Sequence, residues 1–302
     1  MILIALLLMQ TAYTPETEAV MNRSRRQAEE RRADERSAAG ATAARTQAAR
    51  AAAPQGRALS PEMAKKFQQC LDLAIEDPAA GVRFAQAWSV DGGSFPAGQC
   101  RGFAEARAEH WDVAAGAFEA AANEAQKAGS PVDSARLFAQ AGNAALAGGE
   151  GEKARGYFDA ALGHGLPDGL EKGEIYLDRA RTLVAMGDMK GARTDIDLAL
   201  KQAPDDPLGW LLSATLARRQ QDLARARADI AEAKKRAPDD ASIALEDGNI
   251  AILSDDEAGA KAAWQRVVTL SPQSDQAKAA RESLAQLEGE TPAAAPATPP
   301  KP

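Results

Sequence analysis

Small and bulky apolar residues return at a fixed interval along the C-terminal half of the chain. Ala192, Ala226 and Ala260 each stand 34 positions after the one before. A bulky residue follows each alanine by four positions, and a small or branched residue follows it by seven, so all three lie on one face of an α-helix. The bulky residues are Ile196, Ile230 and Trp264, and the others are Ala199, Ala233 and Val267. We therefore predict one amphipathic helix in every period.

A second helical pattern precedes each of these helices, and a proline follows each one. Pro204, Pro238 and Pro272 stand twelve positions after the alanines. Proline ends a helix because it lacks an N–H and disfavours helical geometry in the residue before it. Twelve positions before the alanines stand further small residues, which would let antiparallel helices approach closely. These residues are Ala180, Ala214 and Gly248, and the unit is predicted to be a helical hairpin.

Weaker copies of the same pattern lie toward the N-terminus. The small, bulky and small positions are Ala80, Phe84 and Ala87, then Ala114, Phe118 and Ala121 after Gly102, then Ala154, Phe158 and Ala161 after Gly142. The longer steps coincide with turn-forming stretches near 128–131 and 163–169, which a stack of hairpins tolerates. We predict repeats near 61–94, 95–134, 135–172, 173–206, 207–240 and 241–274, a capping helix over 275–288, and thus a repeat domain over 61–288.

A period of 34 with this order of residues resembles the tetratricopeptide repeat (TPR). The residues that carry the resemblance are Tyr176, Trp210, Ala180, Ala214 and Gly248, together with the alanines and prolines above. The resemblance implies an all-α fold, a right-handed superhelical solenoid of helix-turn-helix units with a C-terminal capping helix. It also implies that a partner protein or peptide binds in a concave groove.

The resemblance places the groove at set positions of each first helix. Those positions hold Lys65, Gln69, Gln99, Phe103, Ala106, Arg136, Asn143, Leu146, Leu177, Arg181, Val184, Leu211, Thr215, Arg218, Leu245, Asn249 and Ile252. The three arginines would suit a segment with some acidic residues. Alternatively, they are solvated or paired with Glu174 and Asp178. Ala139 and Asp178 do not match the lysine and asparagine with which some members of the family grip a C-terminal carboxylate, so that specificity is not expected.

Both ends of the chain differ from the repeats. Residues 1–12 begin with a run of apolar residues too short to span a membrane, and they match a signal for export except that no Lys or Arg precedes the run. A mis-assigned start codon or an apolar cap on a cytosolic protein are the alternatives. Residues 13–60 are rich in Arg, Ala and Glu and are expected to be a tether, helical in part, or an arm that touches acidic lipid or a partner. Residues 289–302 are rich in Pro and Ala and are expected to be disordered.

Composition narrows the classes of partner. Aromatic residues make up only 5% of the 302 residues, so alanine supplies much of the apolar fraction of 45%. The formal net charge is −7, which argues against a nucleic-acid partner because such proteins need a basic face. No transmembrane span and no small-molecule substrate are expected either.

The residues that could carry chemistry are few. Cys70 and Cys100 are the only cysteines, and the template puts them on neighbouring first helices, where they could form a disulfide or remain two buried thiols. His110 and His164 lack further ligands at the spacings that zinc sites use, and paired aspartates at the turns fit helix caps. No nucleophile and base stand together. We therefore expect no enzyme activity, no catalytic residue, no metal and no cofactor.

The function predicted from the sequence is a non-enzymatic protein interaction scaffold in the bacterial cell envelope, with a periplasmic location. The alternatives are a cytosolic TPR adaptor and an accessory subunit of an envelope enzyme complex that handles polysaccharide or peptidoglycan. The sequence does not identify the partner.

Overall fold

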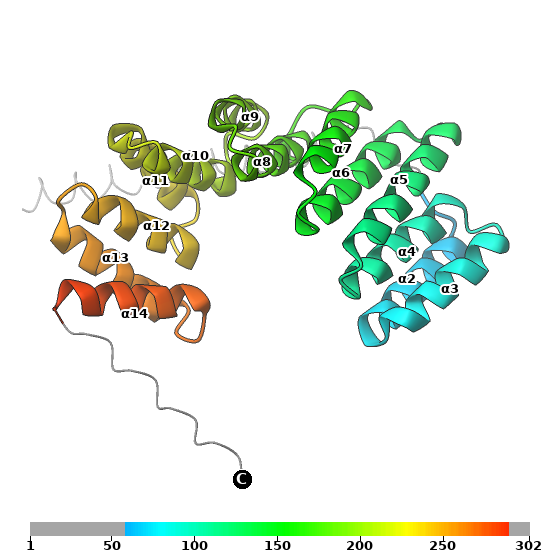
Figure 1. The fold of residues 1–302 in the computed structure, drawn as a ribbon, viewed down its shortest axis with the longest axis horizontal. Helices are drawn as coiled ribbons and strands as arrows, with labels where there is room; N and C mark the ends of the chain where they lie inside the picture. Colours follow the sequence, from blue (N-terminus) through cyan, green and yellow to red (C-terminus); the bar gives the residue numbers. More distant parts are fainter. Residues whose placement is uncertain (1–57, 290–302) are drawn as a thin grey trace, which may run out of the picture. The chain divides into compact units, whose positions relative to one another are not determined.

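The computed structural model describes residues 58–289, which form thirteen α-helices and no strand within that range (Figure 1). The apolar N-terminus, the tether up to residue 57 and the tail from residue 290 lie outside the described residues. The helices are α2 (Pro61–Glu76), α3 (Pro78–Val90), α4 (Ser94–Arg107), α5 (Trp111–Lys127), α6 (Pro131–Ala147), α7 (Gly151–Gly163), α8 (Leu170–Ala185), α9 (Met189–Gln202), α10 (Pro207–Arg219), α11 (Leu223–Arg236), α12 (Ala241–Ile252), α13 (Glu257–Leu270) and α14 (Asp275–Leu287).

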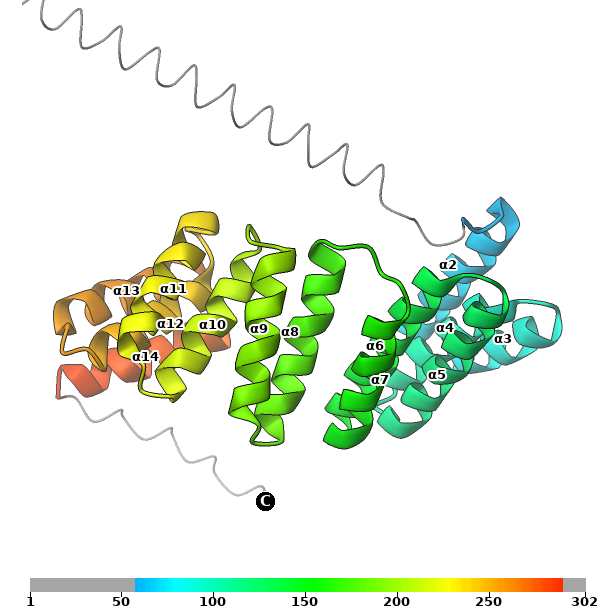
Figure 2. The ribbon, with the colours of Figure 1, turned by 90° about the horizontal axis from the view of Figure 1, so that it is seen from above.

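Consecutive helices pair into six hairpins, and α14 packs on the last of them (Figure 2). The first helices of neighbouring repeats also meet: α2 contacts α4, and α6, α8, α10, α12 and α14 contact one another in succession. No comparable contact joins the second helices of neighbouring repeats among residues 58–289. The first helices therefore form the more closely spaced row, and the side of this row turned away from the second helices is called the inner face below. The predicted all-α helical repeat fold is confirmed.

Each hairpin from the second to the sixth is built around one small and one bulky residue that stand sixteen positions apart. A Cβ atom added to Gly102, Gly142 or Gly248 would lie within 2.4–2.7 Å of the ring of Phe118, Phe158 or Trp264, respectively. In the fourth and fifth repeats the bulky residue is isoleucine, and the small one is alanine rather than glycine: Ala180 with Ile196, and Ala214 with Ile230. All these bulky side chains are at most 5% exposed. The size of one partner thus sets the size permitted to the other.

The first repeat does not follow the predicted register. Ala87 is exposed and Phe84 is only half-buried, whereas Gly81, Ala85 and Trp88 are buried. Asp77 alone separates α2 from α3, and Pro78 starts α3. This short link brings Ala74 against Gly81, where an added Cβ would lie 2.6 Å from the Ala74 Cβ. The buried stripe is therefore shifted by one residue from the predicted one.

Helix starts follow local chemistry. The third and fourth repeats begin at Pro131 and Leu170, about one helical turn before the predicted starts near 135 and 173, because the turn-forming stretches end earlier. Pairs of adjacent aspartates precede three of the helices, and the second aspartate of each pair caps the helix. The pairs are Asp205 and Asp206, Asp239 and Asp240, and Asp255 and Asp256. Asp206 accepts a hydrogen bond from the Leu208 amide at 3.0 Å, Asp240 one from Ser242 at 2.7 Å and Asp256 one from Gly259 at 2.9 Å.

The closing prolines also tie adjacent segments together. The helices α9, α11 and α13 each end two residues before their proline. The carbonyl oxygen of Pro204 accepts a hydrogen bond from Trp210 Nε1 at 2.8 Å, and that of Pro238 accepts one from Arg266 Nη2 at 2.8 Å. The carbonyl of Pro272 accepts one from Arg281 Nη2 at 2.7 Å. A carbonyl that can no longer join the helix is therefore satisfied by a side chain.

Cys70 on α2 and Cys100 on α4 form a disulfide between the first two repeats. Their Cα atoms lie 6.2 Å apart, and neither side chain is exposed. The template placed the two cysteines on neighbouring first helices, and the structure joins them there. No helix within residues 58–289 combines the length and apolar character needed to cross a membrane.

Candidate protein-binding groove

An apolar depression on the inner face lies across the first three repeats. We call it the aromatic pocket, and it has a volume of about 500 Å³. Helices α2, α4, α5 and α6 supply its walls: Phe67, Leu71, Gln99, Phe103, Ala106, Trp111, Phe118, Gln140, Asn143 and Ala144. A volume of this size is within the range of about 300–1,000 Å³ typical of ligand pockets.

The polar groups of the aromatic pocket are all uncharged. Gln99 on α4 donates a hydrogen bond from Nε2 to the Gln140 Oε1 on α6 at 3.3 Å, which links the second and third repeats. Phe103 is half-buried beside them, and Asn143 is exposed. Amides can donate to and accept from a peptide backbone, while the aromatic walls take an apolar side chain. The pocket therefore suits an extended or helical segment with a large apolar residue.

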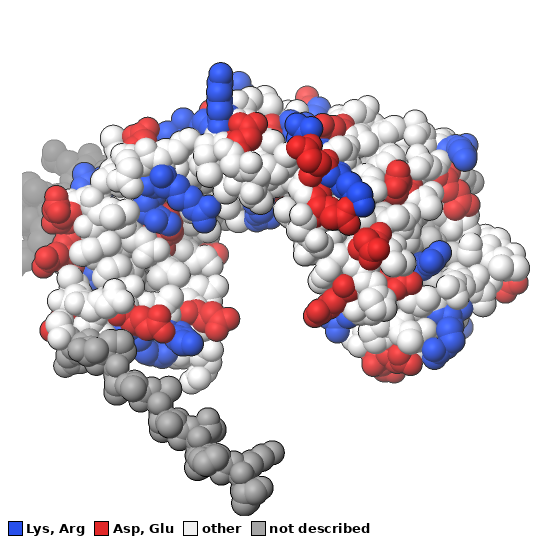
Figure 3. Space-filling view, viewed as in Figure 1, with Lys and Arg blue, Asp and Glu red and all other residues white. Residues whose placement is uncertain are grey.

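An acidic face follows the pocket on α8. Glu171, Glu174, Asp178 and Arg181 are spaced by three, four and three residues, so they lie along one side of the helix. Asn143 donates to Asp178 at 3.1 Å, which shows that this side meets α6. Figure 3 shows acidic and basic side chains crowded together where α6 and α8 meet.

Burial and repulsion raise the pKa of Glu174. The larger cause is the partial burial of its carboxyl, and the carboxylates of Asp206, Asp178 and Glu171 add to it. No ion pair joins Glu174 to another residue in the part of the chain that the structure describes. Its charge therefore faces solvent.

The three arginines of the predicted groove are paired within the chain. Arg136 on α6 donates to Glu171 on α8, with Nη2 and Oε2 3.0 Å apart, and this hydrogen bonding raises the pKa of Arg136. Arg218 on α10 makes the equivalent contact with Glu246 on α12, at 2.7 and 3.1 Å. Arg181 donates to Asp178 at 2.6 Å. The alternative of paired arginines thus holds, although Glu171 and Glu246, rather than Glu174, accept from two of them.

The structure corrects one predicted groove residue. Leu177 is 1% exposed and belongs to the core of the fourth repeat, with Ala180, Ala192 and Ile196. The helical register explains this, because Glu174, Asp178 and Arg181 occupy the inner face and Leu177 therefore turns toward α9. Leu211 is half-buried, and Asn249 is held by a hydrogen bond of 3.3 Å from Trp264 Nε1.

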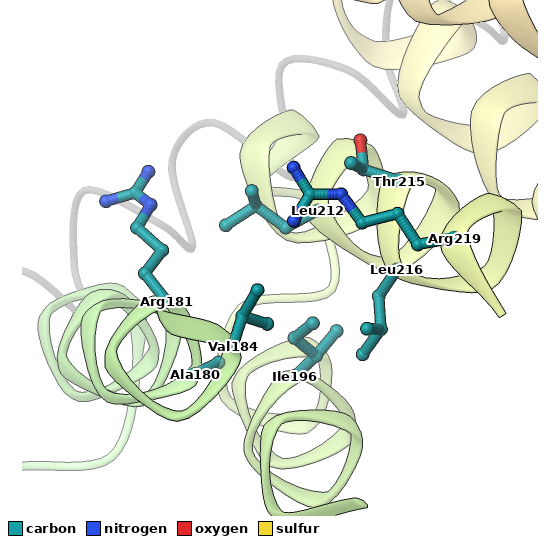
Figure 4. Close-up of a pocket in the computed structure, with 8 residues that line it drawn as sticks. All are labelled: Ala180, Arg181, Val184, Ile196, Leu212, Thr215, Leu216 and Arg219. Atoms are coloured by element: carbon teal, nitrogen blue, oxygen red, sulfur yellow. The ribbon is translucent and has the colours of Figure 1, made fainter. Parts of the chain in front are cut away.

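A second, smaller depression lies between the fourth and fifth repeats and is called the junction pocket (Figure 4). It has a volume of about 160 Å³. Five apolar residues surround it, and Arg181, Thr215 and Arg219 complete the lining; the apolar ones are Ala180, Val184, Ile196, Leu212 and Leu216. The structure thus brings Arg181, Val184 and Thr215 of the predicted groove together here, and Gln99, Phe103, Ala106 and Asn143 together in the aromatic pocket.

Several lining residues were missed by the sequence analysis. Gln140 follows Arg136 by four positions and precedes Asn143 by three, so helical periodicity could have found it. Phe67 and Leu71 were hidden by the uncertain register of the first repeat. Trp111 opens a second helix, and a template of first-helix positions gives no signal for it.

Residues 58–289 contain no group of three or more His, Cys, Asp or Glu side chains that could hold a metal ion. His110 precedes α5, and its Nδ1 lies 2.9 Å from Glu105 Oε2. His164 follows α7 and stacks on Phe138 with ring centroids 5.2 Å apart. Both histidines therefore lie at helix ends and have structural contacts there.

Comparisons with known proteins show the fold. No protein-family model matches the sequence, and no curated protein matches it either. Among solved structures, the chain is similar to PilW, a type IV pilus biogenesis factor, with 17% identity over 73% of this chain and 99% of PilW and a TM-score of 0.59. It is similar to a tetratricopeptide repeat protein from Parabacteroides merdae, with 14% identity over 75% of this chain and 88% of that one and a TM-score of 0.58. PilF of Pseudomonas aeruginosa gives 15% identity, 74% and 99% coverage and a TM-score of 0.55. The chain therefore has the tetratricopeptide repeat fold.

Proposed function

We propose that this tetratricopeptide-repeat solenoid is a non-enzymatic scaffold that binds a segment of a partner protein along the inner face of its first helices. The observation that carries the proposal is the aromatic pocket, an open space of about 500 Å³ with apolar walls and uncharged amides. Apolar side chains that surround an open depression mark an interaction site, and Phe67, Phe103 and Trp111 are such side chains here.

The partner acts in the bacterial cell envelope in this proposal, and the chain works in the periplasm. Two observations support that location. The sequence begins with a short apolar run that matches a signal for export. PilW, which shares the fold, is described as a type IV pilus biogenesis factor. We expect to recover the protein with the periplasmic fraction. Recovery with the cytosol would contradict the location and leave the groove proposal unaffected.

Site-specific crosslinking in cells tests the groove. A photo-crosslinking amino acid at Gln99 should yield a defined adduct with one partner. Phe103→Glu should abolish that adduct, because it places a charge in the apolar pocket. Asn123→Glu is the matched control, since Asn123 is exposed on α5, the second helix of the same repeat. The groove proposal fails if the adduct survives Phe103→Glu, or if a crosslinker at Asn123 captures the same partner equally well.

A further inference from the structure

The junction pocket differs from the aromatic pocket in size and charge. Its volume of about 160 Å³ is close to that of a dry protein cavity of about 150 Å³ that holds one benzene molecule. It therefore accommodates one aliphatic or small aromatic side chain rather than a longer stretch of a partner. Its floor consists of the Ile196 and Leu216 side chains, which also belong to the core of the fourth repeat.

Of the two arginines that line this pocket, Arg219 is the one without an ion pair within residues 58–289. It is exposed and has no hydrogen bond or ion pair with another described residue. Figure 4 shows Arg219 reaching from α10 toward the space above Leu212, while Arg181 rises from α8 on the opposite side. No acidic residue lines the pocket.

The neighbouring acidic residues are directed elsewhere. Asp178 accepts a hydrogen bond from Asn143 on α6 as well as one from Arg181, so it faces the third repeat and not α10. Glu246 on α12 is occupied by Arg218, on the side of α10 that faces the sixth repeat. The charge available at the junction pocket is therefore positive, in contrast to the acidic face one turn earlier on α8.

We infer that the junction pocket binds a leucine-like side chain of a partner segment and that Arg219 pairs with an aspartate or glutamate next to it. The inference rests on the proposed function and states the chemistry of one contact in the same groove. The occupant is an internal stretch of a partner chain, and its acidic side chain rather than a terminal carboxylate pairs with Arg219. The row of first helices continues past the pocket on both sides and therefore accommodates a chain that runs through it. Exposed ion pairs of this kind select the neighbour of the anchor more than they add to affinity.

Methyl NMR of the full-length protein tests this directly. The probe is N-acetyl-Gly-Leu-Glu-Gly-amide, titrated against protein labelled in Leu and Val methyl groups. We expect saturable shifts at Val184, Leu212 and Leu216. Replacing the probe's Glu by Gln should weaken binding about two- to fivefold, the range of an exposed ion pair. Replacing its Leu by Ala should remove the shifts.

Protein variants assign the ion pair to Arg219. Arg219→Gln should lower the affinity for the Glu probe to that for the Gln probe. It should leave the affinity for the Gln probe unchanged. Arg155→Gln is the matched control, because Arg155 is an exposed arginine on α7 outside both pockets. The control should bind the two probes as the unaltered protein does.

Three results would overturn the inference. They are no shift at these methyls, an equal loss of affinity for both probes in Arg219→Gln, or much tighter binding of N-acetyl-Gly-Gly-Leu with a free carboxylate than of the Glu probe. The last result would mean that the pocket takes a chain terminus. In each of these cases a crosslink from Gln99 that depends on Phe103 would still uphold the proposed function, so the two failures are distinguishable.

Discussion

Gly142 on α6 faces the ring of Phe158 on α7, and replacing it with alanine tests how the hairpins are held together. The added Cβ would lie 2.7 Å from Phe158 Cε1 and 2.8 Å from Cζ, which is closer than unstrained side chains approach. Phe158 has no exposed surface and lies within a core cluster, so its ring can move only by displacing packed neighbours. We therefore expect Gly142→Ala to strain the third repeat.

The magnitude follows from two opposing effects. Gly→Ala inside an exposed helix stabilises by about 1 kcal/mol, whereas overpacking a well-packed core costs about 1–3 kcal/mol. The matched control is Gly156→Ala on α7, where the added Cβ would meet nothing within 4 Å. The control should show the full gain, so the two variants should differ by about 1–3 kcal/mol, or about 2–4 °C in Tm for each kcal/mol.

A second change should relieve the strain. Phe158→Ile combined with Gly142→Ala converts the third repeat to the alanine–isoleucine pair found at Ala180 and Ile196 in the fourth. The double variant should therefore be more stable than the sum of the two single changes by about 0.5–3 kcal/mol, the range of coupling between contacting residues.

Thermal and urea unfolding of the full chain, followed by circular dichroism, measures these differences. Hydrogen exchange of the α6 amides should accompany them, because repeat arrays do not always unfold as a single unit. The packing argument is refuted if Gly142→Ala stabilises as much as Gly156→Ala. It is also refuted if the double variant is no more stable than the sum of the two single changes.

Three further predictions concern charge and covalent linkage. Arg179→Met should cost about 3–5 kcal/mol, because Asp195 is 3% exposed and loses two guanidinium hydrogen bonds of 2.7 Å; adding Asp195→Asn should restore much of the lost Tm, and no recovery would contradict the role of the buried charge. Glu174→Gln should raise Tm at neutral pH, because the raised pKa of Glu174 means that its charged form destabilises the fold above that pKa and has no effect once both states are protonated; a gain confined to acidic pH would contradict this. Reducing the Cys70–Cys100 bridge should lower stability by about 3–4 kcal/mol, the loop-closure value for a sequence separation of 30, and an unchanged melting curve with reductant would disprove it.

The candidate groove was only partly predictable. Gln99, Phe103 and Asn143 fall on the inner face because a helix repeats its faces every 3.6 residues and the template fixed the register there. Leu177 was misplaced by the same template, because Glu174, Asp178 and Arg181 occupy the inner face of α8 and Leu177 belongs to the core of the fourth repeat. The charge of the groove was not predictable at all, because Arg136 and Arg218 meet Glu171 and Glu246 at sequence separations of 35 and 28 that no local pattern encodes.

The sequence by itself determined the hairpins and their order. Spacings of four, seven, twelve and sixteen residues decide which small and bulky side chains share a helix face and meet within one hairpin, and these contacts are local. Only the tertiary structure decided the register of the first hairpin, in which Gly81 and Trp88 are buried, and the way neighbouring repeats meet. The features at the junctions between repeats are the pairing of the groove arginines and the two pockets of different charge. Those features depend on the distance and rotation between successive hairpins, which loops of unequal length change without altering the repeat pattern.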